Sequence, residues 1–294
     1  MRSLLDEIAR RLADAPALDE ATRLDALREA RLLVAATLGC TTGDLARRVD
    51  RPVPYTERDR ILAAVARRVK GEPLAYAVGT APFRHMTLHV DARVLIPRPE
   101  TETVVEEALR ISHQRPGGIA IDIGTGSGAI ALALATEGTF ERIIGTDVSS
   151  DALDVARANA ELIGPSVPVE FRHGSDFGPL TGMRARVIVS NPPYIAYSEA
   201  SGLPASVRDW EPVTALFAGD GGMARYDVLL SEAASYLEPG GFLVCEVDAQ
   251  RAGETADRAR RLGWTDVRLV RDLSGRDRVL VATASLPSPG PEAR

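Results

Sequence analysis

The pattern of apolar and polar positions changes twice along the chain. Over residues 1–77 apolar side chains recur every three or four positions, as at Leu5, Ile8 and Leu12, which predicts amphipathic helices. Residues 78–97 alternate around Met86 to Val90 and contain turn residues, so we predict a β-hairpin connector. From residue 119 onward short apolar runs alternate with helical stretches, which is typical of a parallel α/β sheet. We therefore predict an α/β fold preceded by a small all-helical bundle.

The predicted sheet has seven strands, each a short run rich in β-branched and other apolar residues. They are expected near residues 119–123, 141–146, 167–172, 185–190, 241–247, 264–270 and 278–283. Helices of this part are expected near residues 128–136, 150–163, 225–237 and 250–262. In the first part, Thr56 and Asp59 resemble a capping box at the start of a helix. The proline-rich residues 286–294 are expected to be disordered.

Composition restricts the class of protein. A length of 294 residues favours two domains over one, and 45% hydrophobic with 26% charged residues is typical of a globular chain. Asp6 and Glu7 lie where a signal peptide needs an apolar core, and no apolar run is long enough to span a membrane. The two cysteines, Cys40 and Cys245, lie far apart. We therefore expect a reduced chain in the cytoplasm that does not associate with a membrane.

The charge distribution argues against a nucleic-acid duplex as the main partner. The net charge is −6, with +2 in residues 1–77 and −8 in the remainder. The four histidines are scattered, so no metal site is expected.

A glycine-rich loop follows the first predicted strand and opens a helix. It runs from Asp122 through Gly124, Gly126 and Gly128, and glycines let a ligand approach the backbone more closely than any Cβ allows. Asp147 ends the next predicted strand, 21 residues beyond Gly126, the spacing expected of a carboxylate that binds ribose hydroxyls. The combination favours a nucleoside cofactor over a purely structural turn.

The identity of that nucleoside stays open at this point. Gly124, Gly126 and Ala129 also satisfy a dinucleotide fingerprint. Asp122, however, precedes the glycines where it could face a cationic ligand such as a sulfonium. After the third predicted strand, Asp176 and Phe177 could hold an adenine by a hydrogen bond and a ring contact, although Asp176 also suits a turn.

A second loop, Asn191-Pro192-Pro193-Tyr194, follows the fourth predicted strand. Neither proline can donate to a strand ladder, and each restricts the residue before it, so the strand must stop here. The result is a stiff loop at the carboxyl end of a strand, where open α/β sheets bind ligands. A plain turn is the alternative interpretation. An amide oxygen from Asn191 and the Pro192 carbonyl could accept the two N–H groups of a planar amino group.

Together, these loops resemble those of class I S-adenosylmethionine-dependent methyltransferases that act on amino groups. Further blocks are similar to the release-factor glutamine methyltransferase family (PrmC/HemK), and with the two loops the resemblance covers about residues 74–283. These blocks are Leu95-Ile96-Pro97-Arg98-Pro99-Glu100-Thr101-Glu102, Glu211-Pro212-Val213-Thr214-Ala215-Leu216 with Gly221-Gly222-Met223, and Arg271-Asp272-Leu273-Ser274-Gly275-Arg276-Asp277-Arg278. The resemblance implies a Rossmann-like seven-stranded catalytic domain over residues 98–285, with residues 1–77 recognising a partner.

The resemblance also implies the reaction and its residues. The expected reaction is methyl transfer from S-adenosyl-L-methionine to the glutamine amide nitrogen in the Gly-Gly-Gln motif of class-1 peptide release factors, with S-adenosyl-L-homocysteine as product. No stable nucleic-acid partner is expected, and the protein is expected to be a monomer. The implied cofactor-binding residues are Asp122, Gly124, Thr125, Gly126, Ser127, Gly128, Asp147, Asp176, Phe177 and Asn191. Asn191, Pro192 and Tyr194 are implied as catalytic, and together with Pro193 and Arg98 as substrate-binding.

Three alternatives stay open. A glutamine methyltransferase of a large-subunit ribosomal protein is disfavoured by Pro99-Glu100-Thr101-Glu102, which we do not expect in that branch. A nucleic-acid amino methyltransferase is disfavoured by the acidic second part of the chain. A protein of a different class, an NAD-binding dehydrogenase or a non-catalytic binding module, would explain the glycine loop but not Asn191-Pro192-Pro193-Tyr194.

Overall fold

The computed structural model describes residues 1–285, and the predicted disorder of 286–294 lies outside them. These residues form two compact units. The first contains residues 1–81, 90–92 and 203–211, and the second contains the rest of the described chain. Among the described residues, no helix is both long and apolar enough to cross a membrane.

The first unit is helical. Its core is formed by apolar side chains of the first, third, fourth and fifth helices, including Ile8, Leu33, Leu45 and Val65, all at most 1% exposed. The helices are α1 (Arg2–Ala13), α2 (Glu20–Leu24), α3 (Ala26–Thr37), α4 (Thr42–Arg47), α5 (Tyr55–Arg68), α6 (Leu74–Val78) and the short α10 (Ala205–Arg208).

The capping box predicted at Thr56 and Asp59 is wrong. Helix α5 starts one residue earlier, at Tyr55, with Pro54 as its N-cap, so Thr56 already lies within the first turn. A capping box does occur at α4, where the Thr41 hydroxyl oxygen accepts from the Asp44 backbone N–H at 3.0 Å and the Asp44 carboxylate accepts from the Thr41 N–H at 3.2 Å.

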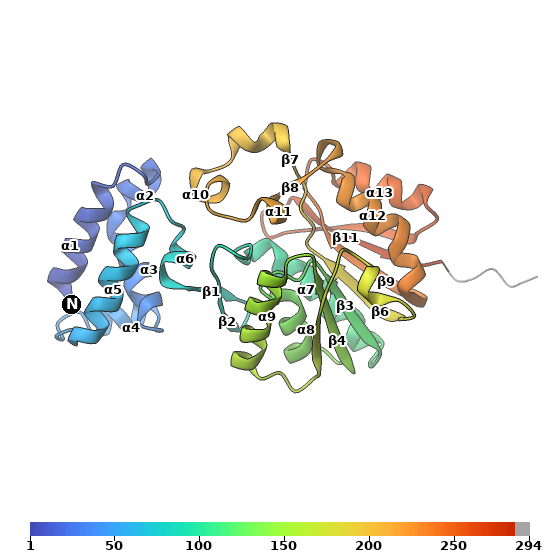
Figure 1. The fold of residues 1–294 in the computed structure, drawn as a ribbon, viewed down its shortest axis with the longest axis horizontal. Helices are drawn as coiled ribbons and strands as arrows, with labels where there is room; N and C mark the ends of the chain where they lie inside the picture. Colours follow the sequence, from blue (N-terminus) through green and yellow to red (C-terminus); the bar gives the residue numbers. More distant parts are fainter. Residues whose placement is uncertain (286–294) are drawn as a thin grey trace, which may run out of the picture. The chain divides into compact units, whose positions relative to one another are not determined.

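The second unit is built on the seven-stranded sheet that the sequence predicts (Figure 1). The strand order is β10-β11-β9-β6-β3-β4-β5; β11 pairs antiparallel with β10 and β9, and the other pairs are parallel. The strands are β3 (Ile119–Ile123), β4 (Arg142–Asp147), β5 (Val169–His173), β6 (Ala185–Ser190), β9 (Leu237–Glu246), β10 (Thr265–Arg271) and β11 (Asp277–Thr283).

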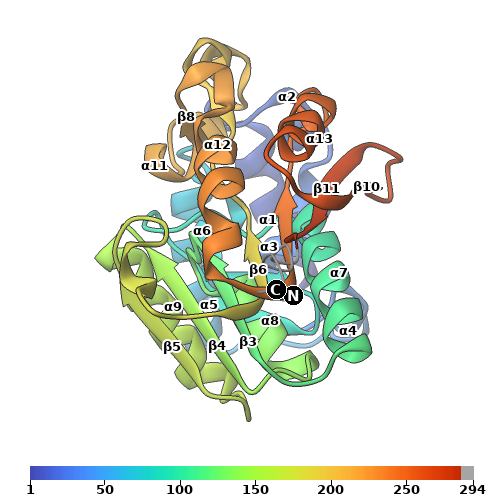
Figure 2. The same ribbon diagram turned by 90° about the vertical axis from the view of Figure 1, so that its right-hand side faces the viewer.

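Helices cover both faces of this sheet because its strands are apolar on both sides (Figure 2). Alternate residues of β3 show the division, since Ala120 packs on one face while Ile121 and Ile123 pack on the other. The first face is covered by α7 (Glu102–Gln114), α8 (Ala129–Glu137) and α9 (Ser150–Ile163). The second is covered by α12 (Ala224–Glu232) and α13 (Ala252–Arg261).

A hairpin of β1 (Thr80–Phe83) and β2 (Met86–His89) precedes the sheet. Its turn residue Arg84 forms an ion pair with Glu137 at the end of α8, at 2.7 Å, and its backbone N–H donates to Glu102 at 2.9 Å. These contacts fix the hairpin tip to the start of α7 and the end of α8.

The chain between β6 and α12 contains only short elements. A two-stranded parallel ribbon joins β7 (Ile195–Ala196) to β8 (Phe217–Ala218). Besides α10, the other elements are the 3₁₀ turn η3 (Tyr197–Gly202), the helix α11 (Val213–Leu216) and the 3₁₀ turn η4 (Asp220–Gly222). Further 3₁₀ turns occur elsewhere in the second unit, namely η1 (Pro99–Thr101), η2 (Gly178–Leu180) and η5 (Ala233–Tyr236).

Candidate active site

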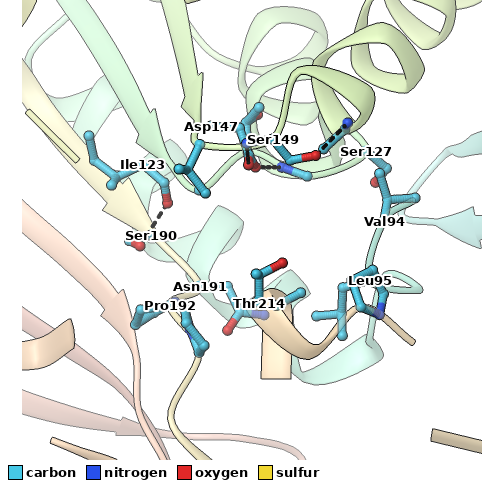
Figure 3. A pocket seen from close by; sticks show the side chains of 18 of the residues that line it. Val94, Leu95, Ile123, Ser127, Asp147, Ser149, Ser190, Asn191, Pro192 and Thr214 are labelled. Carbon is cyan, nitrogen blue, oxygen red and sulfur yellow. Dashed lines mark hydrogen bonds between the residues drawn. The ribbon is translucent and has the colours of Figure 1, made fainter. Parts of the chain in front are cut away.

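A cavity of about 370 Å³ opens at the carboxyl ends of β3, β4 and β6. Figure 3 shows Asp147, Ser149 and Ser127 on one side of it and Asn191, Pro192 and Thr214 on the opposite side. The predicted site residues that line it are Arg98, Gly124, Thr125, Gly126, Ser127, Asp147, Asp176, Asn191, Pro192 and Pro193. The carboxyl edge of the sheet thus brings the two predicted loops to one cavity.

The glycine loop is fixed by its own backbone. The N–H groups of Gly124 and Thr125 both donate to the Thr146 carbonyl of the neighbouring strand at 2.9 Å. Gly124 and Gly126 have φ of 73° and 53°, and a Cβ at either position would meet no protein atom within 4 Å. Since both line the cavity, a side chain here would fill space that a ligand could use. The loop therefore fits a closely approaching ligand.

Asp147 faces this loop across the end of β4. Its Oδ2 accepts from the Gly126 backbone N–H and its Oδ1 from the Ser149 backbone N–H, both at 2.9 Å (Figure 3 draws the second). A carboxylate oxygen can accept a second hydrogen bond, so each remains able to accept from a ribose hydroxyl. The carboxylate thus holds the loop and lines the cavity at the same time.

Asp122 lies beneath the glycine loop and does not line the cavity. Its side chain is fully buried, and Oδ2 accepts from the Thr125 hydroxyl at 2.6 Å and from the Ala131 backbone N–H at 3.2 Å. Oδ1 has no hydrogen-bond partner among the described residues. Burial raises the pKa of Asp122 to about 7, against the hydrogen bonds from Thr125 and Ala131, which lower it. Asp122 therefore supports the loop from below, and its carboxylate is not part of the cavity wall.

Gly128 at the start of α8 and Asn159 on α9 support the loop. Gly128 has φ of 81°, and a Cβ there would lie 3.3 Å from Ala156, so this glycine lets α8 and α9 approach. The fully buried Asn159 amide donates to the Ser127 carbonyl at 2.9 Å and to the His89 carbonyl at 3.0 Å. Asn159 is a support that the sequence analysis missed, since an asparagine inside a helical pattern gives no signal by itself.

Asp176 and Phe177 have different positions. Asp176 lines the cavity at φ of 48° and pairs with Arg225, which also lines it. The Phe177 side chain is 1% exposed and stacks on Tyr236 in the core at a ring-centroid distance of 4.9 Å. Phe177 does not line the cavity, so the geometry gives its ring a packing role where we expected an adenine contact.

Asn191 lines the cavity opposite the glycine loop. Its Nδ2 donates to Thr101 Oγ1 at 3.0 Å, which turns Oδ1 away from Thr101. Ser190, the last residue of β6, donates from its hydroxyl to the Ile123 carbonyl at 2.8 Å (Figure 3). The two strand ends that carry the glycine loop and Asn191 are therefore tied directly to each other.

Tyr194 lies behind its loop and is not among the residues that line the cavity. Its hydroxyl donates to Glu246 Oε1 at 3.2 Å, and its ring packs against the core on the second face of the sheet. Burial and the neighbouring Glu246 carboxylate raise the pKa of the Tyr194 hydroxyl, which therefore stays protonated and serves as a donor.

Comparisons with known proteins agree with a helical first part followed by a methyltransferase fold. Residues 3–79 match the PrmC N-terminal domain, and residues 106–203 match the methyltransferase small domain. The chain is 37% identical to the release factor glutamine methyltransferase of Moorella thermoacetica, covering 96% of this chain and 98% of the relative. The chain belongs to the release factor glutamine methyltransferase family.

Other relatives agree with that assignment. The release factor glutamine methyltransferase of Geobacter sulfurreducens is 39% identical over 86% of this chain and 87% of its own. A solved methyltransferase from Pyrococcus furiosus shares the fold with a TM-score of 0.51 and 20% identity, over 79% of this chain and 99% of that one. The fold and family are those of S-adenosylmethionine-dependent methyltransferases, and the protein is a methyltransferase.

The family motif that ends in Gly221-Gly222-Met223 has a steric explanation in this methyltransferase. Gly222 has φ of 93°, and a Cβ there would lie 2.3 Å from the Tyr194 carbonyl oxygen and 2.6 Å from Arg251 Nε. Arg251 Nε in turn donates to the Gly221 carbonyl at 2.7 Å. Only glycine lets this turn pack against the backbone of the Asn191-Pro192-Pro193-Tyr194 loop.

The cavity of this methyltransferase has further lining residues that the sequence did not single out. Tyr197 is 64% exposed and stacks on Phe217 at a ring-centroid distance of 5.2 Å, and both rings line the cavity. Thr101 also lines it, and the sequence indicates this residue only as a member of the 95–102 motif. Glu246 lies behind Thr101 and Tyr194, and an acid within the apolar run 242–247 is the signal that could have pointed to it.

Proposed function

We propose that this methyltransferase transfers a methyl group from S-adenosyl-L-methionine to the side-chain amide nitrogen of the Gly-Gly-Gln glutamine in class-1 peptide release factors. Family membership supports the substrate class. The observation that carries the proposal is the orientation of Asn191, whose amide is held by Thr101 while its residue lines the cavity opposite the glycine loop. The glycine loop alone gives no reason for a fixed asparagine amide on the opposite side of the cavity.

The residues on the glycine-loop side fit a nucleoside cofactor. Gly124 and Gly126 leave room for close approach, Asp147 offers a carboxylate to ribose hydroxyls, and Asp176 lies on the cavity wall for an adenine amino group. When bound, S-adenosyl-L-methionine supplies an electrophilic methyl group on a sulfonium and leaves as S-adenosyl-L-homocysteine.

The acceptor side must overcome the poor nucleophilicity of an amide nitrogen, whose lone pair is shared with its carbonyl. Asn191 Oδ1 and the Pro192 carbonyl accept the two N–H groups of the substrate amide, which holds the nitrogen in line for transfer and favours positive charge developing on it. The prolines fix the second carbonyl in a rigid backbone. One N–H proton leaves after transfer, so the chain needs no strong base at this position.

The helical first unit is proposed to recognise the release factor. Leu24 is 81% exposed on α2, so it can be replaced to probe this surface without disturbing the core. We expect Leu24→Glu to raise the KM for the release factor and to leave the Kd for S-adenosyl-L-methionine unchanged. Within this proposal the protein acts as a monomer in the cytoplasm.

The acceptor is tested by transfer of labelled methyl groups to purified release factors. The control is the same release factor with the Gly-Gly-Gln glutamine replaced. Label in the native protein and none in the control supports the assignment, whereas label that survives the replacement refutes it. Calorimetry that detects NAD binding and no S-adenosyl-L-methionine binding would instead support a dehydrogenase.

A further inference from the structure

A buried chain of hydrogen bonds lies behind the acceptor side of the cavity. Glu246 ends β9 and is 1% exposed. Its Oε2 accepts from the Thr101 hydroxyl at 2.5 Å, and its Oε1 accepts from the Tyr194 hydroxyl at 3.2 Å. Thr101 Oγ1 in turn accepts from Asn191 Nδ2 at 3.0 Å. Glu246 therefore reaches Asn191 through one hydroxyl group, without lining the cavity itself.

The direction of each hydrogen bond follows from the carboxylate. An ionised carboxylate can only accept hydrogen bonds, so the Thr101 hydroxyl uses its single hydrogen to donate to Glu246. Thr101 Oγ1 can then only accept a hydrogen bond from Asn191. The Asn191 amide therefore turns its NH₂ group, Nδ2, toward Thr101. If the side chain at position 246 instead donated a hydrogen bond to Thr101, the Thr101 hydroxyl would donate to Asn191. The Asn191 amide would then turn Oδ1 toward Thr101.

We propose that Glu246 and Thr101 are positioning residues that set the orientation of the Asn191 amide, so that Oδ1 and not Nδ2 faces the acceptor nitrogen. The inference rests on the proposed function, because only an acceptor that presents N–H groups requires an oxygen here. With the amide reversed, Nδ2 would direct its hydrogens at the hydrogens of the substrate. Tyr194 completes the arrangement by occupying the second carboxylate oxygen.

Burying the Glu246 carboxyl group lowers the stability of the fold, and a positioning role gives a reason for an acid at this place. Burial raises the pKa of Glu246, while the hydrogen bond from Thr101 and the charge of Arg278 lower it. Arg278 is held by Asp272, whose side chain also accepts from the backbone N–H groups of Ser274 and Arg276. The turn of the β10–β11 hairpin thus positions the positive charge that favours the ionised form of Glu246.

The first test replaces the hydroxyl at position 101. We expect Thr101→Val to lower kcat about tenfold or more and to leave the Kd for S-adenosyl-L-methionine unchanged, since the cofactor side is untouched. Thr101→Ser keeps the hydroxyl and is expected to stay within about twofold of the native kcat. Thr255→Val is the matched control, because Thr255 is fully buried and its hydroxyl donates to the Arg251 carbonyl at 2.8 Å. A native kcat in Thr101→Val, or an equal loss in Val and Ser variants, would overturn the proposal.

The second test changes the carboxylate with almost no change in shape. Glu246→Gln can present its NH₂ group to Thr101, which then donates to Asn191 and reverses the amide. We expect kcat to fall about tenfold with an unchanged cofactor Kd. Glu238→Gln on the same strand, where Glu238 pairs with Arg186 at 3.0 Å, is the control expected to keep native kcat.

A spectroscopic readout separates this proposal from the proposed function. The chain has two asparagines, Asn159 and Asn191, so protein labelled with [¹⁵N]asparagine shows two side-chain amides. We expect one Asn191 amide proton to exchange slowly in the native protein and in Thr101→Ser and to lose that protection in Thr101→Val. Asn159 reports the integrity of the fold in each variant. If native protein fails to methylate release factors, the proposed function fails, while protection of Asn191 that is insensitive to Thr101→Val refutes the positioning role.

Discussion

On the cofactor side of the cavity, Asp147 reaches Gly126 across 21 residues of sequence and Asn159 reaches Ser127 across 32. On the acceptor side, Asn191 reaches Thr101 across 90 residues and Thr101 reaches Glu246 across 145. The first side is therefore organised within one strand–helix–strand–helix segment. The second exists only when distant parts of the second unit have packed together. This difference predicts that the two sides respond differently to substitution.

The largest expected effect is the loss of turnover in Asn191→Ala. Removing Oδ1 takes away one of two acceptors for the substrate amide, which we expect to lower kcat by about 10²–10³. The Kd for S-adenosyl-L-methionine should change little, because the glycine loop and Asp147 remain in place. Methyl-transfer assays and calorimetry measure the two quantities separately. A variant that keeps its rate and loses cofactor affinity would show that Asn191 belongs to the cofactor side.

Asp122 predicts a dependence of stability on pH. Its folded pKa of about 7 lies above the ordinary aspartate pKa of 3.8, so between these values the unfolded state releases a proton that the folded state keeps. The unfolding free energy therefore falls as pH rises through this window and levels off above about pH 7. Asp122→Asn lacks this titrating group, so its unfolding free energy should not show this fall. The difference in unfolding free energy between variant and native protein should therefore grow by about 3 kcal/mol, in favour of the variant, from about pH 5 to about pH 8. Urea unfolding at both pH values checks it, and a constant difference would contradict the burial argument.

Gly222→Ala tests the steric support of the acceptor loop. The added Cβ would overlap the Tyr194 carbonyl oxygen, and the positive φ adds strain, so we expect a loss of about 2 kcal/mol of unfolding free energy together with a lower kcat. Gly182→Ala is the control, since Gly182 also has positive φ, of 78°, but a Cβ there meets nothing within 4 Å. Equal effects in the two variants would mean that strain alone, and not the contact with Tyr194, explains the glycine.

The smallest expected effect is on the cofactor side. Asp147→Ala removes the acceptor of the Gly126 N–H and a partner for ribose hydroxyls, and we expect the Kd for S-adenosyl-L-methionine to rise about tenfold. At saturating cofactor kcat should stay near native, which is the reverse of the pattern expected for Asn191→Ala. Asp151→Ala, an exposed residue in the first turn of α9, is the control. A large fall in kcat at saturation would remove the distinction between the two sides.

Much of the catalytic fold could be predicted, because its strands are buried on both faces and read as apolar runs. The predicted strand 185–190 coincides with β6, and the predicted helix 150–163 coincides with α9. Strand β9 starts at Leu237, four residues earlier than predicted, because Pro239 and Gly240 break the apolar pattern. The register of β6 against β9 is irregular between Ala185 and Val187, beside this stretch.

The short elements between β6 and α12 gave no usable pattern. A strand of two residues or a helix of four is too short for either period to show, and tertiary contacts fix them instead. The aromatic side chains show the same limit. We expect Phe177 at the cofactor and Tyr194 at the substrate, yet the first ring packs in the core and the second packs against it. A sequence does not tell which way a ring in the loop after a strand points.

The residues of the acceptor side lie far apart in the sequence, and this affects when the site can form during synthesis on the ribosome. The glycine loop and Asp147 leave the ribosome about a hundred residues before Glu246, which at ordinary elongation rates is an interval of roughly 5–20 s. In the later part of that interval the nascent chain holds the glycine loop, Asp147 and Asn191, while the Thr101 hydroxyl has no carboxylate to donate to and the Asn191 amide is free to take either orientation. Competence for methyl transfer is thus delayed until the C-terminal strands have joined the sheet.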